Sequence, residues 1–241
     1  MIALTLMETR LMIREKAALL IVILLPAALL VGFGLSSDGT VDPKLGQTMA
    51  GFIAAIGLGI ALAVIGFTIV PATLATYRER GMLRRLAVTP ARPHWLLVAQ
   101  LVVNTALALV ATAVLLILGR VGFGVPLPVS PGWFALAFVL TLAALFAIGL
   151  LIAAVARTGK TGQGIGMAVF FPSMFFAGVY VPVEFLPRPL QVAGDFTPLG
   201  AGLHALRDSW TGETPTLLHL LVLSAWAVVA GTLAARFFRW E

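Results

Sequence analysis

Six long runs of mainly apolar residues, each without a charged side chain, constrain this sequence more than any other feature. An α-helix needs about 20 apolar residues to cross the ~30 Å hydrocarbon core of a bilayer. The runs are continuous and do not alternate in hydrophobicity, as the strands of a membrane β-barrel do. We therefore expect six membrane-spanning helices, at residues 17–35, 49–75, 95–119, 132–156, 162–182 and 217–235.

The composition agrees with a chain that is solvated by lipid. Apolar residues make up 60% of the 241 residues and charged residues 11%, whereas a soluble domain has about 45–50% and about 25%. This excludes a soluble enzyme, because too little polar surface is left to cover a globule of this size. The prediction is an all-α integral membrane protein that forms a single domain over residues 1–241.

The distribution of basic residues predicts the orientation of the chain. Six spans place both termini on one side, and 12 of the 16 Lys and Arg residues fall on that side. Since cytoplasmic segments of membrane proteins are enriched in Lys and Arg, we expect both termini in the cytoplasm. The net charge of +6 then reflects this bias and not nucleic-acid binding. A multi-pass protein of the inner or plasma membrane, from a bacterium, is expected.

Motifs for catalysis and nucleotide binding are incomplete. The Arg-Thr-Gly-Lys-Thr segment at 157–161 resembles the end of a phosphate-binding loop, but Ala154 stands where that loop needs glycine. His94, His204 and His219 lie in separate regions without metal-ligand spacing, and no Asp or Glu lies inside a run. We expect no catalytic residue, no ATPase site, no metal and no cofactor in this chain, and hence no enzyme.

The most specific feature is the polar stretch between the second and third runs. Residues 77–90 read YRERGMLRRLAVTP, and Pro90 and Pro93 limit any helix here to about two turns. At a period of 3.6 residues, Met82, Leu83 and Leu86 share one side, and Arg84 and Arg85 point to the other. Such a short helix must pack on something, either the lipid headgroups or a groove on a cytosolic partner.

A second long connection, residues 183–215, joins the fifth and sixth runs on the outer side. Its prolines prevent one continuous helix, while its apolar residues are too many for a free loop. We expect short helical pieces that dip into the outer leaflet as a re-entrant segment, with an ordinary surface loop as the alternative.

These strings together resemble one family. YRERGMLRRLAVTP after the second run, and FFPSMFFAGVYVPVEFLP, TPLG and ALRDSWTG later, are similar to type-2 ABC-transporter permeases of the daunorubicin-resistance-like drug-exporter branch. The resemblance implies that Glu79, Arg80 and Gly81 open a short cytosolic coupling helix, which docks on a separate ATP-binding subunit. The residues that precede the first run are few for the family's interfacial elbow helix, and Arg10 and Arg14 interrupt their apolar face, so that element stays open.

The resemblance also implies a half-transporter, in which two copies of the chain join two ATP-binding subunits that hold ATP and Mg²⁺. In that family the second and fifth helices line the path at the dimer interface. Both are rich in glycine here, which permits close helix approach, and Pro172 should kink the fifth. The expected path residues are aromatic or Met: Phe52, Phe67, Phe170, Phe171, Met174 and Phe175. Alternatively, these side chains face lipid or pack internally.

The sequence thus favours the membrane subunit of an ATP-driven exporter for a hydrophobic or amphipathic, drug-like or antibiotic-like substrate. Charged groups are missing from the interiors of the second and fifth runs, and an unpaired charge there would be costly. A permease of the same family for a lipid or lipid-linked glycan is the alternative, and a membrane scaffold without transport is an alternative of another class.

Overall fold

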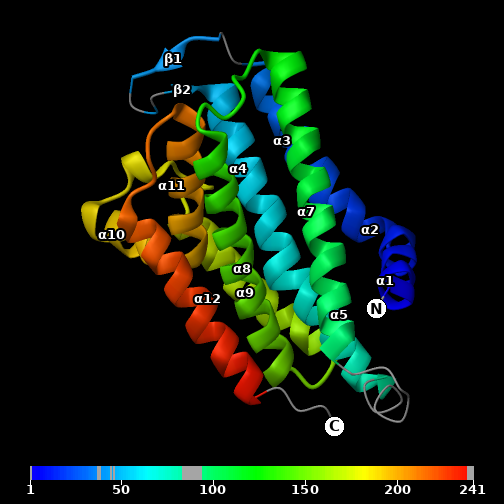
Figure 1. Ribbon diagram of the computed structural model, residues 1–241. Coiled ribbons are helices and arrows are strands. Elements are labelled where there is room, and N and C mark those ends of the chain that lie inside the picture. Colours follow the sequence, from blue (N-terminus) through cyan, green and yellow to red (C-terminus); the bar gives the residue numbers. More distant parts are fainter. Residues whose placement is uncertain (1, 37–38, 44, 46, 83–93, 238–241) are drawn as a thin grey trace.

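Helices make up most of the computed structural model, which describes residues 2–36, 39–43, 45, 47–82 and 94–237 (Figure 1). Within these residues, five helical segments are long and apolar enough to cross a membrane: Lys16–Gly34, Met49–Glu79, Trp95–Phe123, Pro131–Val155 and Leu217–Phe237. They coincide with five of the predicted runs. The all-α membrane fold is therefore confirmed, while the number of six spans stays a prediction.

The remaining predicted run falls on α9 (Gly159–Phe176), which is 18 residues long. Lys160, Thr161 and Gln163 in its first turns make it less apolar than the five other segments. The predicted end at Pro182 is wrong, because the helix stops at Phe176 and Gly178 then turns the chain with φ of +75°. A left-handed glycine just beyond the last turn is a common helix stop.

The first two spans each contain a π-helical turn next to a proline. The first consists of α2 (Lys16–Leu19), η1 (Leu20–Leu24) and α3 (Leu25–Gly34), and the second of α4 (Met49–Ala63), η2 (Val64–Ile69) and α5 (Val70–Glu79). Pro26 and Pro71 stand in the first turns of α3 and α5. Proline cannot donate a hydrogen bond and its ring crowds the carbonyl four residues earlier, so the wider π turn accommodates each ring.

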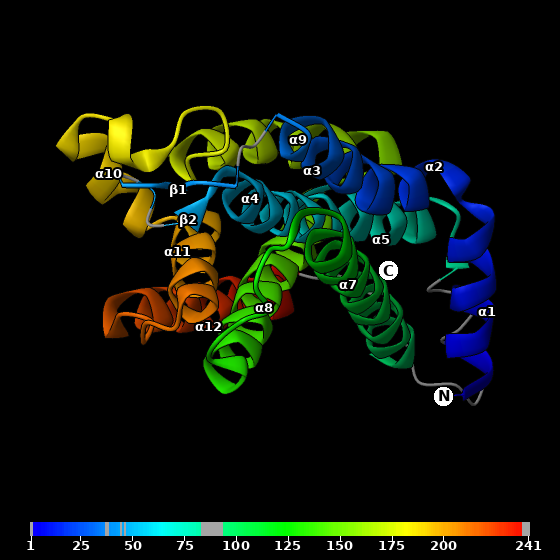
Figure 2. The same ribbon diagram turned by 90° about the horizontal axis from the view of Figure 1, so that it is seen from above.

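The second span is the centre of the molecule. It is contacted by α3, α8 (Pro131–Val155), α9 and the long helix α7 (His94–Phe123), as Figure 2 shows from above. In its most apolar window 83% of the residues are buried, compared with 22% in the first span and in α12 (Leu217–Phe237). A span that is buried all round by protein leaves the outer helices to face lipid.

Glycines bring α8 and α9 into backbone contact with this central span. A Cβ atom at Gly166 would overlap the carbonyl oxygen of Phe67, and one at Gly162 would lie 2.9 Å from the carbonyl oxygen of Pro71. On the α8 side, a Cβ at Gly149 would overlap the carbonyl oxygen of Gly66. The predicted close approach through small residues is confirmed. The Phe67 carbonyl is also the one that Pro71, four residues later, deprives of its helical donor.

Residues Ile2–Arg14 form helix α1, which runs across the axes of the long helices. It is seen nearly end-on in Figure 1 and along its length in Figure 2. Between the first two spans, β1 (Val41–Asp42) and β2 (Gln47–Thr48) pair antiparallel as a short hairpin. Helix α1 thus shows that the residues before the first span are helical, which the sequence had left open.

The predicted short helical pieces between the last two runs are confirmed as η3 (Val183–Phe185, a 3-10 turn), α10 (Arg188–Asp195) and α11 (Pro198–Thr211). Proline at the start of α11 and the Thr197 side chain, which accepts a hydrogen bond from the Gly200 N–H at 3.1 Å, begin that helix. Helix α11 packs on α4 and α8. Trp210 fixes its far end by donating to the carbonyl of Pro126 at 2.7 Å.

Candidate functional site

The last turn of α5 connects to four other helices through three consecutive side chains, Tyr77, Arg78 and Glu79. We call these residues the Tyr77–Glu79 junction. They lie at the end of the bundle where α5 and α8 end and α9 begins, which we call the Glu79 end.

Arg78 caps the end of α8. Its Nη1 donates to the carbonyl oxygens of Ala153 at 2.8 Å, Ala154 at 2.9 Å and Ala156 at 3.3 Å. The last carbonyls of a helix have no partner inside the helix, and a cation there is favoured by the helix dipole. Arg78 on α5 therefore supplies hydrogen-bond donors to the last carbonyl groups of the neighbouring helix α8.

Glu79 caps the start of α9. Its carboxylate accepts a hydrogen bond from the backbone N–H of Gly159 at 3.0 Å, and an anion is favoured at a helix N-terminus. Next to it, the Thr158 hydroxyl accepts from the Thr161 N–H at 3.1 Å. The segment that resembles a phosphate-binding loop thus serves as the N-cap of α9.

Tyr77 joins α5 to α1 and α7 through a buried polar network. Its hydroxyl donates to the Glu8 carboxylate at 2.8 Å, and the Gln100 amide donates to the same oxygen. Asn104 extends the network by donating to the side-chain oxygen of Gln100 at 3.0 Å. Glu8 is 2% exposed, and burial raises the pKa of its carboxyl while the two hydrogen bonds lower it.

This network was not predicted from the sequence. Glu8 stands before the first run, between Met7 and Thr9, and Gln100 and Asn104 are polar residues one helical turn apart inside the third run. That spacing was a signal, since residues i and i+4 share a helix face.

The predicted coupling residues are only partly within the described structure. Glu79 is the last residue of α5, Arg80 is its cap, and Gly81 turns the chain with φ of +65°. These three residues therefore end α5, and the coupling helix expected to follow them stays a prediction. Met82 packs against the core. Leu83, Arg84, Arg85 and Leu86 lie outside the described residues.

The six predicted path residues do not share one surface of the single chain. Phe67 and Met174 are buried in the core, and Phe52 is buried beneath the guanidinium of Arg207, whose Cζ lies 4.8 Å from the ring centre. Phe170 and Phe175 are half-buried, and Phe171 is 57% exposed. For Phe67 and Met174 the structure matches the alternative of internal packing.

Beyond the polar first turns of α9, with exposed Lys160, Thr161 and Gln163, its exposed residues form an apolar stripe. Gly164, Met167, Ala168 and Phe171 are exposed at the spacing of a single helix face. Pro172 lies inside the helix, and the Ser173 hydroxyl donates to the Val169 carbonyl at 2.8 Å. We call Gly164, Met167, Ala168 and Phe171 the α9 stripe.

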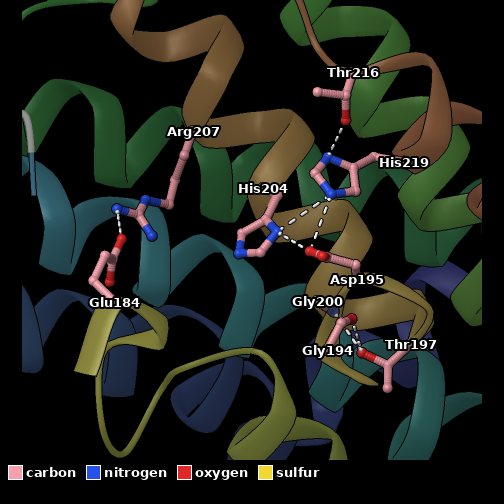
Figure 3. Close-up of polar contacts among 9 residues, drawn as sticks. All are labelled: Glu184, Gly194, Asp195, Thr197, Gly200, His204, Arg207, Thr216 and His219. Carbon is pink, nitrogen blue, oxygen red and sulfur yellow. Dashed lines mark hydrogen bonds and ion pairs between the residues drawn. The ribbon is translucent and has the colours of Figure 1, made fainter. Parts of the chain in front are cut away.

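At the opposite end, a polar hollow of about 440 Å³ opens between η3, α11 and the start of α12. Arg207 and Glu184 both line the hollow and form an ion pair at 2.8 Å (Figure 3). His204 and His219 also line it, with ring nitrogens 3.4 Å apart. These two histidines show no metal-ligand spacing in the sequence, but the fold brings them together. Burial and the neighbouring His219 lower the pKa of His204.

Comparisons with known proteins agree with this architecture. The family model described as "ABC-2 type transporter" matches residues 1–210. A curated relative, "ABC transporter G family member 20" from Dictyostelium discoideum, is 30% identical in an alignment that covers 62% of this chain and 22% of that protein. The match thus spans about a fifth of the relative's length.

Proposed function

The chain belongs to the ABC-2 type transporter family and is a transmembrane subunit of an ABC transporter, and on this premise we propose that it is the permease of an exporter for hydrophobic or amphipathic compounds. In this proposal two copies form the path, and two separate ATP-binding subunits hydrolyse ATP. The Glu79 end faces the cytoplasm.

The observation that carries the proposal is the Tyr77–Glu79 junction. An ATP-binding subunit that docks beyond Gly81 pulls on the last turn of α5, whose side chains hold α8 by three hydrogen bonds and α9 by one. Through Tyr77 the same turn is connected to α1 and α7. A displacement of this single turn therefore moves several helices together.

The packing of α9 determines which elements follow that displacement. Gly162 and Gly166 hold α9 against α5 and η2 at backbone contact, so these elements move as one unit. The opposite face of α9, the α9 stripe, is apolar and exposed in the single chain. We assign this stripe to the interface with the second copy, where it contacts the substrate.

The chemistry of the stripe favours apolar substrates. Methionine and phenylalanine offer dispersion contacts and ring stacking, and the hydroxyls of Thr68 and Ser173 are occupied by the carbonyls of their own helices. An amphipathic molecule can leave its polar group at the headgroup level while its apolar part contacts the stripe.

The test is transport by the chain reconstituted in proteoliposomes with its ATP-binding subunit. Phe171→Ala should lower ATP-dependent uptake of a fluorescent hydrophobic dye into inside-out vesicles, while Leu221→Ala, on α12 and 58% exposed, should not. Equal uptake by both variants would contradict the assignment of the stripe. Stimulation of ATP hydrolysis by hydrophilic metabolites, and not by hydrophobic compounds, would contradict the substrate class.

A further inference from the structure

Three side chains from three separate helices meet at one point beside the polar hollow. Asp195 is the last residue of α10, His204 lies in α11, and His219 lies in the first turn of α12 (Figure 3). The Asp195 Oδ1 atom is 3.0 Å from His204 Nδ1 and 3.3 Å from His219 Nε2. The two ring nitrogens are 3.4 Å apart. The three ligand-type atoms thus form a nearly equilateral triangle.

We propose that Asp195, His204 and His219 form a site for a transition-metal dication, Zn²⁺, which joins α10, α11 and α12. Zn²⁺ binds imidazole nitrogen and carboxylate oxygen at about 2.0–2.2 Å in a tetrahedron. Two ligands of such a tetrahedron lie about 3.3–3.5 Å from each other. The three measured sides of the triangle, 3.0, 3.3 and 3.4 Å, are close to that separation.

The surroundings of His219 are those of a metal ligand. Its other ring nitrogen, Nδ1, is 2.7 Å from the Thr216 hydroxyl. A ligating histidine usually donates its second N–H to a neighbouring group, which fixes the tautomer and leaves the other nitrogen free for the metal. With the proton on Nδ1, the lone pair of Nε2 points into the triangle.

Hydrogen bonds alone explain the triangle less well. Asp195 accepts protons from both rings only if His204 Nδ1 and His219 Nε2 each carry a hydrogen, and these two N–H groups then stand 3.4 Å apart. A dication between the three atoms replaces both protons and contacts all three lone pairs.

The site is open to ions. The side chains of Asp195 and His204 are 27% and 17% exposed, and that of His219 is 10% exposed. The adjoining hollow, which both histidines line, leaves room for a water molecule as fourth ligand, as in zinc sites with three protein ligands. Asp208 and Glu213 line the same hollow and favour a cation, whereas Glu184 and Arg207 in its lining pair with each other at 2.8 Å. This inference does not depend on the proposed transport function.

The experiment uses the full chain, purified in detergent and stripped with a chelator that is then removed. Calorimetric titration with ZnCl₂ should show one ion bound per chain, and MgCl₂, which prefers oxygen ligands, should show none. Asp195→Asn and His204→Gln should each weaken Zn²⁺ binding at least about 100-fold, and Thr216→Val about 10-fold. The matched control is Glu213→Gln, a carboxylate of the same hollow outside the triangle, which should leave the affinity within about threefold.

A second readout needs no variant. Co²⁺ in place of Zn²⁺ should give the visible absorption of a four-coordinate ion, and excess Zn²⁺ should abolish it. The proposal is overturned if the unmodified chain shows no saturable Zn²⁺ binding, if Co²⁺ remains six-coordinate, or if Asp195→Asn and His204→Gln bind Zn²⁺ as the parent does.

Discussion

Two glycines on α9 provide a matched test of how closely this helix packs on the central span. A methyl group at Gly166 would overlap the carbonyl oxygen of Phe67, whereas a methyl group at Gly164 would have no atom of the described structure within 4 Å. Both changes to alanine raise helix propensity by about 0.5–1 kcal/mol. The difference in unfolding free energy between Gly166→Ala and Gly164→Ala therefore isolates the overlap.

Overpacking of a well-packed interior costs about 1–3 kcal/mol. For a chain of this size, 1 kcal/mol corresponds to about 2–4 °C in Tm, so Gly166→Ala should melt about 2–12 °C below Gly164→Ala. The assay is tryptophan fluorescence during heating of the single chain in detergent micelles. Equal melting temperatures would show that α9 does not contact the Phe67 carbonyl and would refute the packing of α9 on η2.

Two further predictions concern Glu8 and the orientation of the chain. Burial raises the pKa of Glu8, so folding favours the protonated carboxyl. The stability that this group contributes is therefore present below the unfolded pKa of about 4.5 and is lost as the pH rises through the folded pKa. The Tm of Glu8→Gln minus that of the parent should therefore increase from pH 4 to pH 7.5, and a constant difference would contradict the burial of the charge. Because the sequence contains no cysteine, an impermeant thiol reagent outside cells should label Val129→Cys and not Lys160→Cys, and the reverse would overturn the cytoplasmic placement of the Glu79 end.

Features set by local chemistry were predictable from the sequence. The apolar runs located the spans because unpaired backbone groups and charges are excluded from hydrocarbon, and five of the runs coincide with long apolar helices. The glycines of the second and fifth runs predicted backbone contact, which Gly162 and Gly166 make. The prolines between residues 183 and 215 predicted several short helices.

Features that depend on contacts between distant segments were not predictable in the same way. Glu8, Tyr77 and Gln100 come from three helices, and nothing in their local sequence shows that one carboxylate receives both donors. His204 and His219 are 15 residues apart on different helices, so their spacing does not resemble that of metal ligands on one element. Glu79 was predicted only as part of a coupling helix and Arg78 only as one of the basic residues of the cytosolic side, whereas each caps the end of a neighbouring helix.

In the proposed function, the transmembrane subunit is coupled to its ATP-binding partner through the Tyr77–Glu79 junction. Arg78 donates three hydrogen bonds to the end of α8, and one hydrogen bond to or from a charged group contributes about 1.5–3 kcal/mol. Arg78→Met removes these bonds but leaves residues 80–93 unchanged. Arg157→Met, an exposed arginine at the same end, is the matched control.

The decisive measurement is substrate-stimulated ATP hydrolysis by the chain co-reconstituted with its ATP-binding subunit. The parent and Arg157→Met should be stimulated by a hydrophobic substrate. Arg78→Met should still co-purify with the ATP-binding subunit and keep basal hydrolysis. It should lose most of the stimulation, about 10-fold or more for a loss of about 1.4 kcal/mol or more in coupling. A parent chain that neither retains an ATP-binding subunit nor alters its hydrolysis, or an Arg78→Met variant that is stimulated like the parent, would contradict the claim.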